Sequence, residues 1–134
     1  MGFANLEDLL AIEKEVKWEE RDLPSTLFGL LSRTATSFPD RPAVSYQILS
    51  GPKDKAETLT WSELHTKTIQ AANMFRSLGV GSDDVVAYIL PNANETVLTL
   101  LGGAIAGIAN PINPLLDAEQ IGAILRETNA KVVV

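Results

Sequence analysis

The chain has 134 residues, a length typical of one domain, and its 46% hydrophobic and 21% charged residues exclude the polar, highly charged composition of disordered proteins. Its 17 acidic and 11 basic residues give a formal net charge of −6, and because the basic residues are scattered, nucleic acid is not expected as a partner. There is no cysteine, which excludes disulfides, thiolate metal sites and thiol nucleophiles.

The first 23 residues are predicted to form an acidic helical extension that precedes the main domain, residues 24–134. The apolar residues of this extension recur at roughly helical spacing, at Leu6, Leu9, Leu10 and Val16. No basic stretch leads into an apolar run, so the segment lacks the pattern of a secretory signal, and we expect a cytoplasmic protein.

A second helix is predicted after Pro24, where Ser25 or Thr26 can accept hydrogen bonds from the backbone of the first turn. Phe38 and Pro39 end this helix. The apolar residues of its stripe are Leu27, Leu30, Leu31 and Ala35.

Two short runs with strand-like composition follow, at Ala43–Leu49 and Glu57–Thr60, and a polar Gly-Pro-Lys-Asp stretch separates them. Alternating apolar residues on either side of a connection that contains Gly and Pro are typical of two strands joined by a turn. We therefore predict a β-hairpin.

Thr60 and Glu63 have the spacing of a capping box, in which a hydroxyl and a carboxylate satisfy backbone donors at the start of a helix. The helix predicted here ends at Gly79, because glycine is favoured in the left-handed position after a helix. Its apolar face consists of Leu64, Thr68, Ala71, Ala72, Phe75 and Leu78.

Strand and helix patterns alternate in the remainder of the chain. The predicted strands are Val85–Leu90, Ala109–Ile112 and Lys131–Val134. The predicted helices are Asn94–Gly107 and a helix capped by Asp117, which turns Ile121, Ile124 and Leu125 inward. This alternation predicts an α/β fold with a mostly parallel sheet and right-handed crossovers.

The apolar run Val97–Ala109 covers 13 residues, whereas a membrane span needs about 20, so we predict a buried helix and no membrane span. Within the run, Gly103 and Gly107 have the four-residue spacing of a helix face that packs closely on a neighbour, which here is the sheet.

The chain stops in the middle of its last predicted strand, and a natural domain rarely ends so abruptly. We therefore expect a truncated domain. Its unfinished sheet edge could also pair two copies of the chain, so a homodimer is a further expectation.

Three motif-like features are better explained by structure than by chemistry. Gly79-Val80-Gly81 follows a helix and precedes a strand, which is the reverse of a dinucleotide-binding loop. Asp83 and Asp84 could hold magnesium, but they stand before a strand rather than after it, which favours a solvated turn. His65, the only histidine, has no partner in a recognisable catalytic motif and is expected on the surface or at a rim.

Pro91–Glu95 is the one stretch whose position suits ligand recognition, because it follows the carboxyl end of a predicted strand and begins a helix. Local structure explains the same residues, since Asn94 is a good helix N-cap and Pro91 a good strand terminator. We favour capping at this corner.

Five pieces of the chain, between about Leu27 and Val134, carry a resemblance to a known family. They are Phe38-Pro39-Asp40-Arg41-Pro42-Ala43-Val44; Leu59-Thr60-Trp61-Ser62-Glu63-Leu64, with Trp where the family usually has Tyr; Gly79-Val80 followed by Asp84-Val85-Val86-Ala87 and Leu90-Pro91-Asn92; Gly107-Ile108-Ala109-Asn110-Pro111-Ile112-Asn113-Pro114; and Ala130-Lys131-Val132-Val133-Val134. In this order and spacing they resemble the start of the adenylate-forming superfamily of acyl-CoA synthetases, peptide-synthetase adenylation domains and luciferases. Asp83 departs from the family's glycine, which affects the local turn if that position requires a positive φ.

The resemblance implies a ligase that converts ATP and a carboxylic acid, expected to be a fatty acid, into an acyl-adenylate and then transfers the acyl group to CoA. Mg²⁺ would offset the phosphate charge. The wording of the first and fourth pieces favours CoA ligases of fatty or other carboxylic acids over peptide-synthetase modules. The family's phosphate loop, hinge and catalytic lysine have no counterpart in these residues. No catalytic, cofactor-binding or metal residue is therefore assigned, and the piece alone is expected to be inactive and to bind none of ATP, Mg²⁺ and CoA.

Two other classes of function remain open at this point. A free-standing α/β binding or regulatory module would need a finished sheet and a pocket at the Asn92 strand end. An interaction protein that dimerises through its sheet edge would show an oligomeric state that depends on concentration.

Overall fold

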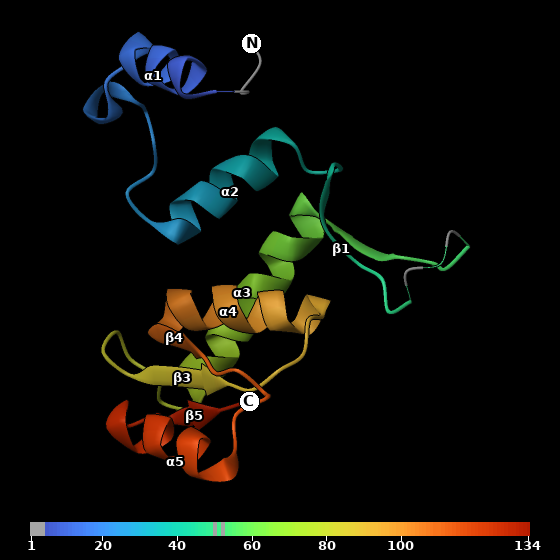
Figure 1. Cartoon of the computed structure of the whole chain (residues 1–134), viewed down its shortest axis with the longest axis vertical. Coiled ribbons are helices and arrows are strands. Elements are labelled where there is room, and N and C mark those ends of the chain that lie inside the picture. Colours follow the sequence, from blue (N-terminus) through green and yellow to red (C-terminus); the bar gives the residue numbers. More distant parts are fainter. Residues whose placement is uncertain (1–4, 50, 52) are drawn as a thin grey trace.

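The computed structural model describes residues 5–49, 51 and 53–134. The amino-terminal segment lies apart from the remaining elements (Figure 1). Its helix α1 (Leu6–Glu15) starts at Asn5, whose Oδ1 accepts a hydrogen bond from the Asp8 backbone N–H at 3.0 Å, and none of its residues is buried. A single 3₁₀ turn, η1 (Trp18–Glu20), follows it. The predicted amphipathic helix is thus present, but its apolar face covers no core.

Helix α2 (Leu27–Ser37) begins as predicted, because Thr26 is its N-cap and accepts a hydrogen bond from the Gly29 backbone N–H at 3.0 Å. Only some residues of the predicted apolar stripe of α2 are buried. Leu31 and Ala35 are buried, whereas Leu30 is 42% exposed.

Strands β1 (Pro42–Tyr46) and β2 (Glu57–Thr60) pair antiparallel, which confirms the predicted hairpin. Strand β1 is shorter than predicted. Ile48 and Leu49 lie outside it and are 81% and 66% exposed.

Helix α3 (Trp61–Ser77) has the complete capping box that the sequence predicts. The Glu63 backbone N–H donates to the Thr60 hydroxyl at 3.2 Å, and the Glu63 carboxylate accepts from the Thr60 backbone N–H at 2.9 Å. Gly79 follows the helix with a φ of 86°, the left-handed conformation that glycine adopts without strain. Leu78, predicted to face the core, is instead 56% exposed because it lies beyond the last helical turn.

The sheet that follows contains β3 (Val85–Tyr88), β4 (Ile108–Pro111) and β5 (Val132–Val133). Their order is β4-β3-β5 and both pairings are parallel, which confirms the predicted α/β architecture. Helix α4 (Asn94–Ala106) joins β3 to β4, and α5 (Ala118–Glu127) joins β4 to β5. No helix among the described residues is long and apolar enough to cross a membrane.

Central strand β3 has helices on both of its faces. Val86 is fully buried with Phe75 of α3 and Ala106 of α4. Ala87 is also fully buried, and successive side chains of a strand point to opposite faces, so Ala87 needs cover from the other side. Helix α5 lies on that side, across the strands from α4 (Figure 1).

Glycines bring α4 close to its neighbours, and the prediction for them is partly wrong. Gly103 packs on the sheet as predicted, since a Cβ built there would lie 3.4 Å from the Cβ atoms of Val86 and Ala109. Gly107 lies beyond the helix, against the backbone oxygens of Gly81 and Asp84. The tight helix contact is at Gly102, where an added Cβ would lie 2.7 Å from the Ala71 Cβ of α3.

Candidate functional site

The carboxyl end of β3 is the place where this topology favours a ligand. From β3 the chain crosses through α4 to β4, and from β4 it returns through α5 to β5 on the other flank of β3. The strand order therefore reverses between the paired neighbours β3 and β5. The crevice beyond the carboxyl ends of two such strands is the usual binding position in open α/β sheets. Residues 89–93 lead from β3 across this edge into α4.

Asn94 does not cap α4, and that prediction is wrong. Ala93 is the N-cap and offers no side-chain hydrogen bond. Asn94 is instead the first helical residue, is only 2% exposed, and donates from its Nδ2 to the Glu57 backbone oxygen of β2 at 3.2 Å. A tertiary contact with the hairpin has thus replaced the local capping role that the sequence suggests.

A cleft of about 240 Å³ lies between strand β1 and the first turn of α4. Its lining residues are Val44, Ser45, Tyr46, Asn92, Ala93, Asn94, Thr96 and Val97. The Oδ1 atom of Asn94 is buried and has no hydrogen-bond partner among the described residues. The corner chosen from sequence thus contains a hollow and an unsatisfied polar atom.

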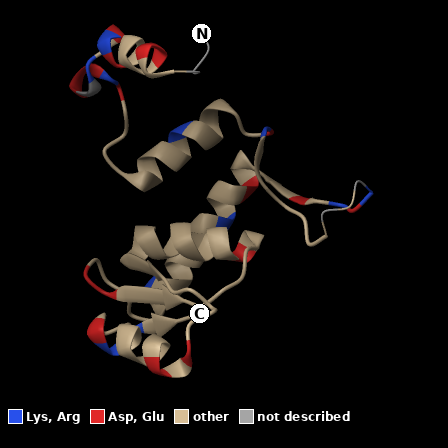
Figure 2. Cartoon of the chain, in the orientation of Figure 1, with Lys and Arg blue, Asp and Glu red and all other residues tan. Residues whose placement is uncertain are grey.

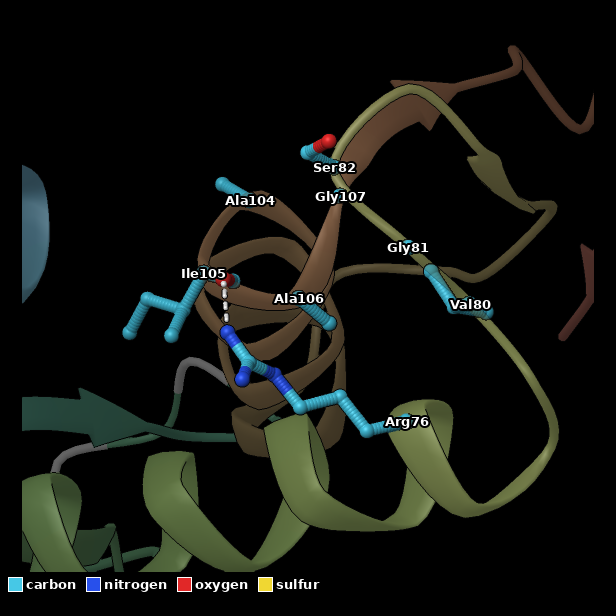
Figure 3. A pocket seen from close by; sticks show the side chains of 8 residues that line it. All are labelled: Arg76, Val80, Gly81, Ser82, Ala104, Ile105, Ala106 and Gly107. Atoms are coloured by element: carbon cyan, nitrogen blue, oxygen red, sulfur yellow. Dashed lines mark hydrogen bonds between the residues drawn. The ribbon is translucent and has the colours of Figure 1, made fainter.

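A larger cleft, of about 530 Å³, lies at the opposite, amino-terminal edge of the sheet (Figure 3). Its lining residues are Arg76, Val80, Gly81, Ser82, Ala104, Ile105, Ala106 and Gly107. Arg76 reaches across from α3 and donates from Nη2 to the Ile105 backbone oxygen at 3.3 Å. The position of Arg76 has a structural explanation, because a cation at the carboxyl end of α4 stabilises the helix. The cleft also lies at the edge opposite to the one where open α/β sheets usually bind ligands, so its size alone does not make it the functional site.

Asp84 has a structural role in the turn before β3. Its Oδ2 accepts hydrogen bonds from the Gly81 backbone N–H at 2.7 Å and from Lys131 Nζ at 2.8 Å. The bond from Lys131, followed by that from Gly81, holds the pKa of the Asp84 carboxyl below its ordinary value. The turn that was predicted to be solvated thus holds one paired carboxylate, the half-buried Asp84, and one exposed carboxylate, Asp83.

The glycine that the family has at position 83 is not required here by the backbone. Among the described residues, Asn129 is the only non-glycine with a positive φ, at 48°, so Asp83 adopts an ordinary conformation. Within the same part of the chain, no three His, Cys, Asp or Glu side chains gather where they could hold a metal ion.

His65 lies between α2 and α3 rather than in a cleft. Its Nε2 is 2.9 Å from the Ser32 hydroxyl, and its ring stacks on Phe28 with centroids 5.7 Å apart. It is half-buried, which fits the predicted rim position, and its contacts dock one helix on the other.

The pieces that carry the family resemblance meet in space. The Trp61 backbone N–H donates to the Arg41 oxygen at 3.1 Å, and the Ser62 N–H donates to the Pro39 oxygen at 3.0 Å, so the first two pieces lie side by side. The third, fourth and fifth pieces contain the three paired strands β3, β4 and β5. These residues thus build one connected framework of the fold.

Comparison with known proteins gives a family match over most of the chain. The family of AMP-binding enzymes matches residues 31–134. The marinolic acid–CoA ligase of Pseudoalteromonas sp. is 34% identical over 130 residues, which are 97% of this chain and 20% of that protein. The sulfoacetate–CoA ligase of Cupriavidus necator is 31% identical over 115 residues, 85% of this chain and 21% of that one.

Solved structures agree with this match. The fatty acyl CoA synthetase of Mycobacterium tuberculosis is 28% identical with a TM-score of 0.65, over 77% of this chain and 20% of that chain. The anthranilate CoA ligase AuaEII, solved with anthranoyl-AMP, is 25% identical with a TM-score of 0.68, over 84% of this chain and 21% of that chain. The chain therefore spans about a fifth of the length of the relatives that it matches.

Proposed function

The chain belongs to the AMP-binding enzyme family, and on this basis we propose that it is the amino-terminal part of a CoA ligase, which we call the parent. The parent would join a carboxylic acid to AMP with release of pyrophosphate and pass the acyl group to CoA. The family match over residues 31–134 carries the proposal. The relatives named above support it, because both are CoA ligases.

The residues described here do not fit a nucleotide or metal site, so we derive no catalytic step from them. They include no phosphate-binding loop, and the carboxylate of Asp84 is paired with Lys131. The contribution that we assign to residues 24–134 is a framework: a parallel sheet, helices on both of its faces, and a carboxyl edge turned toward the remainder of the parent. We assign residues 1–23 to an extension that precedes this framework.

Finer features of the parent are proposed from the same membership. We propose a fatty acid as the acyl substrate, supported by the likeness to the mycobacterial fatty acyl CoA synthetase. Named substrates differ among relatives of similar identity, such as sulfoacetate and marinolic acid, so a wide panel of acids is required. We further propose that the parent uses Mg²⁺ with ATP, acts in the cytoplasm, and can form a homodimer.

The direct test is ATP–pyrophosphate exchange, measured side by side on this 134-residue chain and on the parent. The panel contains fatty acids of several lengths, 2-methylpropanoate and sulfoacetate, each with and without Mg²⁺. We expect exchange by the parent alone, because the chain lacks the phosphate-binding and catalytic segments.

Exchange by neither protein with any acid would contradict the proposal and favour the alternative, a binding or regulatory module without catalysis. Exchange by the 134-residue chain would contradict its assignment as a framework. Sedimentation of both proteins over a range of concentrations tests the homodimer separately.

A further inference from the structure

The first turn of α4 has backbone donors that nothing in the described chain satisfies. No hydrogen bond among the described residues uses the backbone N–H groups of Asn94, Glu95 or Thr96. The N-cap, Ala93, has no side-chain oxygen to offer, whereas Thr26, Thr60 and Asp117 each cap their own helix. Donors at a helix start are normally satisfied by a cap, by water or by a bound group.

Asn94 supplies a second, independent sign of a missing partner. Asn94 is among the residues that line the cleft against β1, and it is only 2% exposed. Its Nδ2 is used by the Glu57 oxygen, but its Oδ1 has no partner among the described residues. A buried amide oxygen without a hydrogen bond is costly, so a group with an N–H or O–H donor is expected to reach it.

The chemistry of the cleft selects between two kinds of occupant. A carboxylate or a fully ionised phosphate would accept from the helix N–H groups but could not donate to Asn94 Oδ1, and any anion would lie near the carboxylate of Glu95 in the same turn. A peptide group has both an acceptor oxygen and an N–H donor, and it is neutral. Val44, Tyr46 and Val97 in the lining add apolar surface that side chains of a peptide can cover.

We propose that a later segment of the parent chain, beyond Val134, docks in extended form in this cleft and caps α4 with its peptide groups. This inference rests on the proposed function, because it requires the longer parent. Position supports it: the Val134 oxygen accepts from the Ile89 N–H at 2.9 Å, so the chain leaves β5 at the edge where residues 89–93 lead into α4. Contact with Asn94 Oδ1 requires a small local movement, since that atom is closed off from solvent in this structure.

Amide hydrogen exchange on the parent, without substrates, tests the proposal. We expect the N–H groups of residues 94–96 to exchange roughly tenfold or more slowly than in an unstructured peptide. The Asn94→Ala variant removes the oxygen that receives the docked segment, and it should restore fast exchange at residues 95 and 96. Asn73→Ala, at an exposed asparagine of α3, is the matched control and should leave their exchange unchanged.

Fast exchange at residues 94–96 in the parent would overturn the proposal, as would protection that appears only when ATP, acid or CoA is added, since a small ligand would then be the occupant. If Asn94→Ala does not fold, the exchange rates of the N–H groups of residues 94–96 in the unmodified parent still test the proposal. ATP–pyrophosphate exchange is measured on the same samples, so a parent that is active but unprotected at α4 refutes this inference alone.

Discussion

Lys131 and Asp84 are 47 positions apart in the chain, yet Nζ of the first lies 2.8 Å from Oδ2 of the second. The pair ties the start of β5 to the turn that enters β3. Because β3 is the central strand, the contact fixes an edge strand at the point where its pairing begins. Acidic and basic residues are otherwise dispersed over the surface, with several acidic residues on α1 and α5 (Figure 2).

The first prediction concerns the pH dependence that this pair produces. The pKa of Asp84 is held below its ordinary value of 3.8, so the carboxylate stabilises the folded chain at pH values above 3.8 and this contribution is lost as the pH falls through the lowered pKa. Asp84→Asn should therefore lower the stability at pH 7 and have a much smaller effect at pH 2. Urea unfolding at both pH values measures the difference.

Asp83→Asn is the control for that experiment, because Asp83 is an exposed neighbour with the same charge. It should change stability little at either pH. An equal effect of the two substitutions would mean that net charge, rather than the contact with Lys131 and Gly81, accounts for the result.

Much of the fold follows from local chemistry and is therefore predictable from the sequence. Thr60 and Asp117 cap their helices as predicted, and Thr26 caps α2, for which the sequence left Ser25 and Thr26 open. A short oxygen-bearing side chain at a helix start bonds within its own turn. The parallel sheet follows from the alternation of strand and helix patterns. The general preference for right-handed crossovers, applied to the order β4-β3-β5, explains why α4 and α5 lie on opposite faces.

The features that were missed depend on contacts between distant segments. Asparagine is as good a helix cap as threonine, but the Asn94 side chain is buried and bonded to the Glu57 oxygen instead. Residue spacing does not indicate this contact between distant segments. Gly102 rather than Gly107 makes the close helix contact, which depends on where α3 crosses α4. The strand-end rule drew attention to the corner at Pro91–Glu95, and the structure has a cleft there, yet the buried, unpaired oxygen of Asn94 is visible only in the structure.

A second prediction concerns Thr68, which is 1% exposed on the inner face of α3. Its hydroxyl has no hydrogen-bond partner among the described residues. Valine has nearly the same shape and no polar atom, so Thr68→Val should stabilise the chain by about 1 kcal/mol. Thermal unfolding measures the change. Thr68→Ala, which leaves a void, should not stabilise; if Val also destabilises, the hydroxyl has a partner that this structure does not show.

A third prediction uses adjacent glycines of α4 as a matched pair. A methyl group at Gly102 would lie 2.7 Å from the Ala71 Cβ and 3.1 Å from the Ala72 backbone nitrogen, so the two helices must separate to admit it. A methyl group at Gly103 meets only ordinary contacts, of 3.4 Å to the Cβ atoms of Val86 and Ala109. Gly102→Ala should therefore destabilise by about 1–3 kcal/mol, the usual cost of overpacking.

The same change at Gly103 should be neutral or stabilise by up to about 1 kcal/mol, because alanine has the higher helix propensity and nothing has to move. Both substitutions raise helix propensity equally, so the difference in the free energy of unfolding between the two variants isolates the packing of α4 on α3. Urea unfolding of the two variants measures it. Equal effects would contradict the close contact of 2.7 Å between an added Cβ at Gly102 and the Ala71 Cβ. The sheet, rather than α3, would then set the position of α4.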